Sequence, residues 1–398
     1  MLDSQGHLVT GATGFIGRHL VRELLARNER VWILVRSTTT QTAHDRARAV
    51  FSTALDSGFL IVLEGDIVKP DMGLDGKSLA ELSKEKITLW HLAADLSFSP
   101  KKSAVAERTN REGTAQVVTF ANRYATRLIH MSTAYVCGDT TRLFTESDFD
   151  VGQRFRNHYE RSKFAAEKIV QDQCVVPHLI FRPSIVIGDA YEGKAEGCTF
   201  GYYRFAFMLH VFQVWLLTTL NRGSVGALVL RTLGTRTSSK DDVVRAPWLL
   251  VPYPTDGFVD MVPIDYVVQS LIQTMLRAEA WRLKTFHLTQ RTPLESRVVM
   301  DQTMQDMGIT GVHYLQVPSW VFFSLVQILY TILWPLRPYT KSVLWYLPYV
   351  ARPYHFDHAH MDALGLPAPS QLSRGFLQRI NRHAKDTVFS TISLDKLF

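Results

Sequence analysis

Cysteine is scarce in this sequence: only Cys137, Cys174 and Cys198 occur among 398 residues. They are odd in number, widely spaced and without a CxxC pair. This pattern argues against a disulfide framework and against a zinc site built on thiolates, and it is typical of a protein in a reducing compartment. The N-terminal residues also lack the basic and long apolar regions of a secretory signal. We therefore expect a cytoplasmic protein.

Apolar runs long enough to span a membrane are also missing. The segment 321–336 holds sixteen residues, which is short of the roughly 20 that a spanning helix needs. Two interpretations stay open: a buried core helix, and a surface helix that contacts a membrane or lines a channel for an apolar substrate. Because Arg337, Lys341 and an aromatic segment follow it, peripheral contact with a membrane is a hypothesis to test.

Charge of either sign is moderate. Lys and Arg number 44 against 37 Asp and Glu, a formal net charge of +7, which favours anionic ligands such as nucleotides, coenzyme A or lipid headgroups. No RNP-like or zinc-finger pattern accompanies the basic residues, so we expect no nucleic-acid partner. His355, His358 and His360 are not spaced as H-E-x-x-H, and we interpret them as part of a surface loop rather than as a metal site.

Short β-branched runs alternate with helical patterns over the first 190 residues. The expected strands are His7–Thr10, Val31–Val35, Phe59–Glu64, Thr88–Leu92, Arg127–Met131 and His178–Phe181. Ile16–Ala26 and Glu112–Ala125 are examples of the helical patterns between them. This alternation predicts an α/β fold with a doubly wound parallel sheet. After residue 190 the sequence becomes more apolar, so we expect a smaller, mainly helical, hydrophobic C-terminal region.

A glycine-rich turn, TGATGFIG, follows the first strand and opens a helix, as a phosphate-binding turn requires. Gly11 permits the tight turn, Gly14 lets the backbone approach a pyrophosphate, and Gly17 permits close packing of helix and strand. The helix N-terminus offers N–H groups and a positive dipole end to the phosphates. The predicted cofactor contacts in this Rossmann-like turn are Gly11, Thr13, Gly14, Phe15, Ile16 and Gly17.

The residues after the second and third strands indicate which dinucleotide binds. An NAD site usually has an acid about 20 residues beyond the glycines, whereas Arg36 occupies this position and fits the 2′-phosphate of NADPH. Arg46 and Arg48 could add positive charge. After the third strand, Asp66 can accept a hydrogen bond from the adenine amino group, and Ile67 can pack on the adenine ring. The sequence therefore predicts NADPH as the cofactor.

Tyr159 and Lys163 form a YxxxK pair. On a helix this spacing puts both side chains on one face, one turn apart. The lysine ammonium favours the phenolate form of the tyrosine and so makes Tyr159 a usable proton donor or acceptor near neutral pH. Ser132 and Thr133 end a strand upstream, and a hydroxyl there can hydrogen-bond a substrate carbonyl.

Together these motifs resemble the extended short-chain dehydrogenase/reductase superfamily. Besides the turn and the YxxxK pair, the resemblance includes Gly65-Asp66-Ile67, His91-Leu92-Ala93-Ala94, Asn110 with Gly113-Thr114, and Arg182-Pro183. It implies that Thr133 orients the carbonyl and that Tyr159 is the general acid/base. It further implies that Lys163 holds the nicotinamide ribose and that Ala93 and Pro183 contact the cofactor.

Within this superfamily the sequence looks most like the fatty acyl reductases and the thioester reductase domains of carrier-protein assembly lines. Segments that carry the likeness include GDIVKPDMGL at 65–74, HMSTAYV at 130–136 and FVDMVPIDYVVQSLIQTM at 258–275. The resemblance implies that 256–290 returns to the nucleotide domain of residues 1–190. Residues 191–255 and 291–398 would then form the substrate region.

The resemblance implies hydride transfer from NADPH to the thioester carbonyl of a long-chain or otherwise hydrophobic acyl group, carried by coenzyme A or an acyl carrier protein. The product would be an aldehyde, and a second hydride would give an alcohol. Two alternatives stay open. One is an NADP-dependent ketone or secondary-alcohol oxidoreductase of the hydroxysteroid dehydrogenase-like branch, and the other is a non-catalytic NADP-binding sensor.

Overall fold

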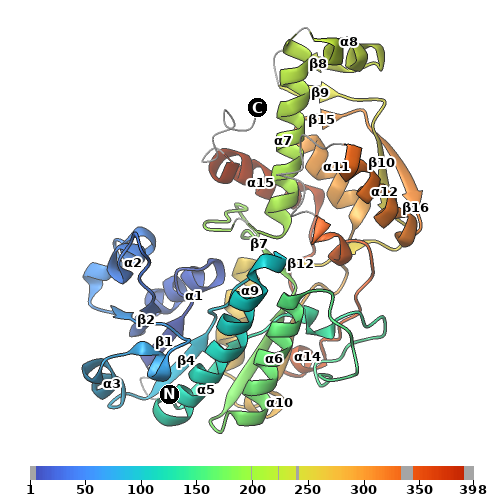
Figure 1. Ribbon diagram of the computed structural model, residues 1–398. Coiled ribbons are helices and arrows are strands. Elements are labelled where there is room, and N and C mark those ends of the chain that lie inside the picture. The colour runs from blue at the N-terminus through green and yellow to red at the C-terminus, as the bar shows by residue number, and fades with distance from the viewer. Residues whose placement is uncertain (1–5, 199, 223, 239–241, 333–343, 390–398) are drawn as a thin grey trace. The chain divides into compact units, whose positions relative to one another are not determined.

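The computed structural model describes residues 6–389 except 199, 223, 239–241 and 333–343 (Figure 1). The chain divides into two compact units. Unit 1 comprises residues 1–186, 264–289 and 355–369, and unit 2 comprises residues 187–263, 290–354 and 370–398. All the residues that the sequence predicts to bind cofactor or to catalyse lie in unit 1.

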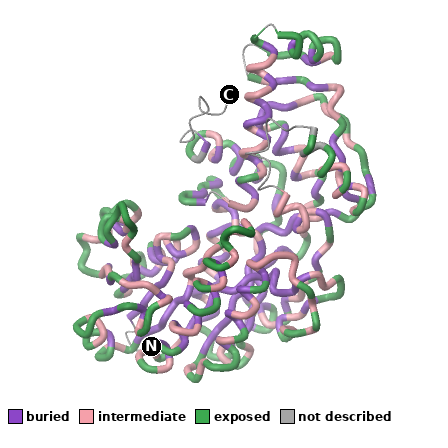
Figure 2. The backbone as a smooth tube through the Cα atoms, in the orientation of Figure 1, coloured by how far each residue is buried: buried purple, intermediate pink, exposed green. Residues whose placement is uncertain are grey.

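Unit 1 is built on a seven-stranded sheet of order β13-β6-β5-β4-β1-β2-β3, in which every pairing is parallel. Its strands are β1 (Gly6–Thr10), β2 (Val31–Val35), β3 (Leu60–Glu64), β4 (Ile87–His91), β5 (Arg127–Met131), β6 (His178–Pro183) and β13 (Thr285–Leu288). β1, β2, β4 and β6 are buried along their whole length, purple in Figure 2, as expected for parallel strands covered on both faces. The predicted α/β fold is confirmed.

Unit 1 also contains α-helices. They are α1 (Phe15–Ala26), α2 (Ala43–Phe51), α3 (Gly76–Leu82), α4 (Ser103–Ala106), α5 (Gly113–Tyr124), α6 (His158–Gln173), α9 (Ile264–Met275), α10 (Ala280–Leu283) and α14 (Ala359–Ala363). Helices α5 and α6 pack against each other, and Val117 and Phe120 of α5 share a core with Leu89 and Leu128 of the sheet. The strand order reverses between β1 and β4, and ligands of such sheets bind at the carboxyl ends of the strands there.

Two later segments of the chain return to unit 1. Strand β13 joins the sheet beside β6, with Thr285 opposite Ile180. Residues 355–369 also belong to unit 1, and Phe356 forms an isolated parallel bridge with Phe144. Residues 355–369 were expected to belong to the substrate region, whereas in the structure this segment packs on the nucleotide-binding unit. Its contacts are mainly to backbone groups, which leave no periodic pattern in the sequence.

Unit 2 combines helices with short strands. The helices are α7 (Tyr202–Asn221), α8 (Val225–Thr232), α11 (Ser296–Asp306), α12 (Ser319–Ile332) and α15 (Arg374–His383). The strands are β8 (Arg236–Ser238), β9 (Val243–Arg245), β10 (Leu250–Pro254), β11 (Phe258–Val259), β12 (Met261–Pro263), β14 (Leu294–Glu295), β15 (Ile309–Thr310) and β16 (His313–Val317), and β7 (Ile185–Ile187) leads into the unit. The buried Tyr202 hydroxyl donates to Oδ1 of Asn381 at 2.6 Å and so ties α7 to α15.

Helix α12 contains the described part of the apolar segment 321–336, of which residues 333–336 lie outside the described residues. Phe322 is buried in a small core with Val317 and Ala351. Trp320 and Ile328, in contrast, are 74% and 54% exposed. The helix therefore has one core face and one exposed face. Within the described residues, none of the helices has the length and apolar character needed to cross a membrane.

Candidate active site

The glycine turn between β1 and α1 brings three backbone segments close together. A Cβ added at Gly11 would lie 2.6 Å from the backbone N of Ala93, and one at Gly17 would lie 2.2 Å from the carbonyl O of Gly11. Gly11 also has a φ of 73°, which favours glycine. Helix α1 has no side-chain cap at Gly14 and no acidic residue in its first turn. Its N-terminus therefore suits an anionic group such as a pyrophosphate.

The other predicted residues of the turn differ in exposure. Phe15 is buried, whereas Thr13 and Ile16 are half-buried. A ligand at the start of α1 would therefore meet the backbone of Phe15 rather than its ring. The ring instead contacts His19, one turn further along the same helix, edge-on at 5.5 Å between centroids.

Arg36 and Asp66 follow β2 and β3, which are neighbours in the sheet. The Arg36 side chain is 62% exposed, and its Nη1 lies 3.7 Å from Oδ2 of Asp66. Arg46 donates a hydrogen bond from Nη1 to the carbonyl O of Arg36. Two guanidinium groups thus lie beside the predicted ribose position, whereas Arg48 is exposed on α2. The ion pair between Arg36 and Asp66 was not predicted from the sequence, because it depends on β2 and β3 being neighbours in the sheet.

The loop after β4 carries Ala93 and is held by a buried asparagine. Oδ1 of Asn110 accepts from the backbone N of Asp95 at 2.7 Å, and its Nδ2 donates to the carbonyl O of Asp95 at 3.0 Å. The same Nδ2 donates to Oγ of Ser162 on α6 at 2.9 Å. One side chain therefore connects the loop to the helix that carries Tyr159. The sequence marked Asn110 only as part of a family motif. That Asn110 connects the loop after β4 to α6 is evident only from the structure.

Helix α6 presents Tyr159 and Lys163 from its first two turns. Its N-cap Asn157 accepts from the backbone N of Glu160, and the Tyr159 ring lies 5.2 Å from that of Phe98. Lys163 is buried, and its Nζ donates to the carbonyl O of Met131 at 2.6 Å. Burial lowers the pKa of the Lys163 ammonium to about 8. The ammonium is thus fixed to the last residue of β5 and remains charged at neutral pH.

The two hydroxyls after β5 have different partners. Oγ of Ser132 donates to Oε2 of Glu167 at 2.5 Å, so this hydroxyl is engaged away from a substrate. Among the described residues, Oγ1 of Thr133 has only long contacts, 3.4 Å to the carbonyl O of Pro183 and 3.4 Å from the backbone N of Tyr135. Long hydrogen bonds are weak and easily exchanged. The geometry therefore favours Thr133, rather than Ser132, as the hydroxyl that meets a carbonyl.

Several predicted residues meet at the carboxyl ends of the strands. Ala93 follows β4 and lies against the Gly11 turn, Pro183 ends β6 and accepts from Thr133, and Ile67 follows β3 and is buried. A Cβ added at Gly113 of α5 would lie 2.9 Å from Cδ1 of Ile67. This close packing fixes the end of β3, so the structure gathers the predicted residues at one edge of the sheet.

Of the three histidines interpreted as part of a surface loop, His355 is exposed and His360 half-buried, so the interpretation is wrong only for His358. His358 is buried, and its Nε2 lies 2.9 Å from Oγ1 of Thr289. Nδ1 of His360 lies 2.8 Å from the carbonyl O of Thr285 and must donate, because a carbonyl only accepts. Among the described residues, no cluster of His, Cys, Asp or Glu could hold a metal ion. The histidines fasten the 355–369 segment to the edge of the sheet.

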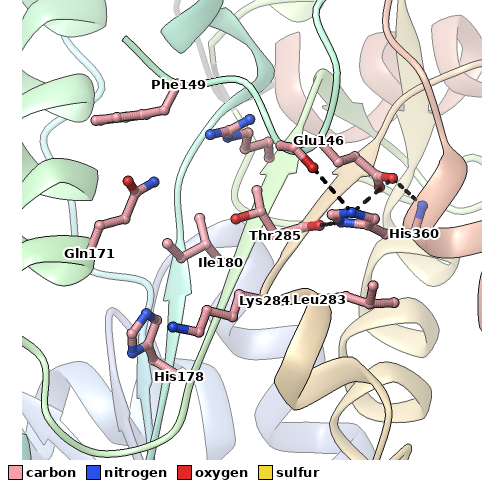
Figure 3. Close-up of a pocket in the computed structure, with 11 residues that line it drawn as sticks. Glu146, Phe149, Gln171, His178, Ile180, Leu283, Lys284, Thr285 and His360 are labelled. Atoms are coloured by element: carbon pink, nitrogen blue, oxygen red, sulfur yellow. Dashed lines mark hydrogen bonds and ion pairs between the residues drawn. The ribbon is translucent and has the colours of Figure 1, made fainter.

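A separate cavity of about 260 Å³ lies beside this segment (Figure 3). Figure 3 shows Glu146 and His360 on one side of it and His178 and Lys284 on another. Both oxygens of the buried Glu146 accept backbone hydrogen bonds, Oε1 from His287 at 2.8 Å and Oε2 from His360 at 2.5 Å. None of the residues predicted for cofactor binding or catalysis lines this cavity.

Comparison with known proteins identifies the family. Residues 9–271, two thirds of the chain, match the family described as male sterility protein. The chain belongs to this male sterility family. The nonribosomal peptide synthetase asaC of Aspergillus flavus is 26% identical over 310 residues, which is 72% of this chain but 26% of that relative. The chain therefore spans about a quarter of the length of this relative.

Two solved structures share the fold of this male sterility family member. The terminal R domain from the myxalamid PKS-NRPS pathway has a TM-score of 0.73 at 21% identity, covering 97% of this chain and 91% of that one. A thiolation-reductase di-domain from an archaeal nonribosomal peptide synthetase has a TM-score of 0.67 at 18% identity, covering 98% and 76%. As a member of this NAD-binding family, the protein is an NAD(P)-dependent oxidoreductase of the extended short-chain dehydrogenase/reductase type, and the two solved structures agree with it in fold.

Proposed function

We propose that the protein is an NADPH-dependent reductase of hydrophobic acyl thioesters. The observation that carries the proposal is the attachment of Lys163 to the end of β5, one residue before Ser132 and two before Thr133. This bond holds α6, and with it Tyr159, beside the one hydroxyl at that strand end with weak partners. A proton donor, an ammonium and a carbonyl-binding hydroxyl are the groups that carbonyl reduction requires.

Each residue has a distinct role in the proposed reaction. Tyr159 and Thr133 donate hydrogen bonds to the thioester oxygen and stabilise the negative charge that develops on it. Lys163 binds the nicotinamide ribose and keeps a positive charge beside Tyr159. NADPH supplies a hydride to the carbonyl carbon when it is bound. The carbon–sulfur bond then breaks, the sulfur leaves as a thiol with one proton, for which Tyr159 is the donor, and an aldehyde remains.

The choice of NADPH over NADH rests on the end of β2. Arg36 stands where an NAD site has an acid, and Arg46 lies against its backbone. Two guanidinium groups favour a 2′-phosphate, which either can contact bidentately. Asp66 offsets part of this positive charge and orients the Arg36 side chain through their ion pair. A bound 2′-phosphate would replace Asp66 as the partner of the Arg36 guanidinium. Gly11, Gly14 and the N-terminus of α1 would hold the pyrophosphate.

The substrate is proposed to be an acyl group on a carrier protein, with acyl-coenzyme A as the second candidate. Support for a carrier-bound substrate comes from the similar proteins. They include a nonribosomal peptide synthetase and a structure in which a thiolation domain and a reductase domain form one di-domain. The apolar composition of unit 2, with dense apolar stretches in α7 and α12, supports a hydrophobic acyl chain. The exposed Trp320 and Ile328 support the further proposal of peripheral membrane contact. Binding of the protein to anionic vesicles tests this contact, and no binding would reject it.

The deciding experiment follows NADPH oxidation and free thiol together. One reaction contains an acylated carrier protein, the second palmitoyl-coenzyme A, and the third a hydrophobic ketone. Equal NADPH loss and thiol release in either thioester reaction is expected, and two NADPH per thiol would show an alcohol product. Oxidation with the ketone alone would assign the protein to the hydroxysteroid dehydrogenase-like branch. NADPH binding without turnover in all three would indicate the sensor.

A further inference from the structure

Helix α6 carries a third ionisable residue on the face of Tyr159 and Lys163. Glu167 follows Lys163 by four residues, so the three side chains lie one above the other at successive turns. Glu167 is completely buried. Its Oε2 accepts from Oγ of Ser132 at 2.5 Å, and its Oε1 accepts from Nε2 of Gln171 at 3.0 Å. The carboxylate therefore bonds to the residue immediately before Thr133.

The counter-charge for Glu167 is Arg182, which is 1% exposed and lies on β6. Nη2 of Arg182 donates to Oε1 of Glu167 at 2.6 Å, and Nε lies 3.1 Å and 3.3 Å from the two oxygens. Nη1 lies 3.4 Å from Nε2 of His287. Nδ1 of His287 lies 3.1 Å from the carbonyl O of Asp357 and must donate to it, because a carbonyl only accepts. Nε2 of His287 is then the acceptor for Arg182, and the imidazole is neutral.

These contacts form one chain from Ser132 through the buried Glu167, Arg182 and His287 to the backbone of Asp357, which is half-buried. Burying an ion pair costs desolvation, and replacing such a pair by apolar residues often leaves stability unchanged or raises it. Stability alone therefore does not account for this pair. The Glu167–Arg182 pair has two features that connect it to the site. Glu167 bonds to Ser132 at the end of β5, and it lies on the same face of α6 as Lys163.

We propose that Glu167 is a positioning residue for the reduction, whose carboxylate fixes the strand end that carries Thr133 and supports the ammonium of Lys163. The proposal rests on the proposed function, because it assigns Glu167 a part in that same site. Arg182 keeps the carboxylate ionised and in one orientation. His287 and the 355–357 segment hold Arg182 from the other side, so the returning segment contributes to the site without meeting substrate.

The charges around Lys163 determine whether removing the charge of Glu167 raises or lowers the pKa of Lys163. Burial lowers the pKa of Lys163, and the charge of Glu167 raises it. His91 of β4 and His130 of β5 also face Lys163, and burial lowers the pKa of both imidazoles below the neutral range. The negative charge of Glu167 thus counteracts the lowering of the Lys163 pKa by burial. Arg182 lies on the far side of Glu167 from Lys163. Removing the charge of Glu167 lowers the pKa of Lys163 further, so the ammonium is lost at a lower pH.

The test uses Glu167→Gln, which keeps the shape and removes the charge. NADPH affinity is measured across pH by nicotinamide fluorescence, and the turnover number is measured with the thioester that the wild type reduces. The pH above which NADPH affinity and turnover decline is expected to fall by about one unit. Turnover at its optimum is expected to fall roughly 10- to 100-fold. Glu167→Asp, which restores the charge, is expected to return the pH limit to that of the wild type.

Glu160→Gln is the matched control, because Glu160 is also completely buried on α6 and pairs with Arg156 at 3.2 Å. It is expected to leave the pH limit at the wild-type value even if it lowers stability. If Glu167→Gln does not fold, Ser132→Ala keeps the ion pair and breaks its bond to the strand end. Ser132→Ala is expected to lower turnover without moving the pH limit.

Two results would overturn the proposal. One is a Glu167→Gln profile within twofold of the wild type in both turnover and pH limit. The other is an equal shift in Glu160→Gln, which would mean that any lost buried charge on α6 has the same effect. Failure of the proposed function gives a different result, since the wild type would then bind NADPH and reduce no thioester. The pH dependence of NADPH binding would still report on Glu167 in that case.

Discussion

Nζ of Lys163 donates a hydrogen bond to the carbonyl O of Met131 at 2.6 Å. The bond joins the second turn of α6 to the last residue of β5, two positions before Thr133. Because the lysine is buried, its charge can be compensated only by groups that the fold places nearby. The Lys163 side chain therefore fixes the position of α6, which carries Tyr159, relative to the end of β5, which precedes Thr133. This connection depends on the protonation of Lys163.

Replacing Tyr159 by phenylalanine is expected to remove the proton donor and little else. The ring contact with Phe98 survives the change, so folding and NADPH binding should remain near those of the wild type. Turnover should fall about 10²- to 10⁴-fold, the usual effect of a lost general acid. Steady-state rates and NADPH fluorescence titration test this on the same preparation. Retained turnover would mean that another group donates the proton.

The activity is expected to decline in alkaline solution as Lys163 loses its proton. Burial lowers the pKa of this ammonium to about 8, and the charged form is the one that binds ribose and supports Tyr159. Activity is therefore present below pH 8 and lost as the pH rises through it. A profile of kcat/KM between pH 6 and 10 shows the limit. Lys163→Met should remove the alkaline decline from the kcat/KM profile and lower kcat/KM at every pH.

Removing the positive charge at Arg36 is expected to reduce the preference for NADPH. Arg36→Ala should raise the KM for NADPH by about 10-fold, because one charge-assisted contact to the 2′-phosphate is lost, and should leave the KM for NADH nearly unchanged. Arg27, which pairs with Glu23 on α1, offers Arg27→Ala as a control for lost surface charge. Equal losses for both cofactors in Arg36→Ala would contradict a contact with the 2′-phosphate.

Two glycines give a matched pair for the cofactor turn. A Cβ at Gly17 would lie 2.2 Å from the carbonyl O of Gly11, whereas one at Gly76 of α3 would meet nothing within 4 Å. Gly17→Ala is expected to lower the free energy of unfolding by about 1–3 kcal/mol and to weaken NADPH binding. Gly76→Ala should be neutral or stabilise the protein by up to about 1 kcal/mol. Thermal and urea unfolding compare the two variants directly.

The stability of unit 1 is expected to depend on pH through Glu146. Burial raises the pKa of this carboxyl from 4.5 to about 7, so the folded state holds its proton more tightly than the unfolded state. The contribution to stability is full below pH 4.5 and is lost as the pH rises through 7. Relative to Glu146→Gln, which cannot ionise, the wild type should lose up to about 3 kcal/mol between pH 5 and 8. A difference that stays constant with pH would contradict this expectation.

Much of unit 1 was predictable from local patterns. The six expected strands match β1–β6 to within two residues at either end, because continuous apolar β-branched runs have few alternatives in a parallel sheet. The glycines of the turn were predictable because a positive φ and a backbone contact both exclude a side chain at Gly11. The return of β13 was expected only through resemblance, since a strand of four residues carries no information about its partner strand.

The contacts that connect distant segments were not predictable. The placement of 355–369 on unit 1 depends on backbone hydrogen bonds to Glu146, and a glutamate that accepts from the backbone has no sequence signature. The interpretation of His358 as a surface residue failed for the same reason. The ion pair between Arg36 and Asp66 joins residues thirty positions apart. It forms because β2 and β3 are neighbours in the sheet.

By itself the sequence determined the fold class and the phosphate-binding turn, since each follows from local spacing and side-chain type. It predicted the chemistry of Tyr159 and Lys163 from their YxxxK spacing and the role of Thr133 from resemblance. Only the tertiary structure decided that Ser132 bonds to Glu167 while Thr133 keeps weak partners, and that Lys163 is buried against β5. The physical reason is that burial and hydrogen-bond partners come from segments that the fold, and not the chain order, brings together.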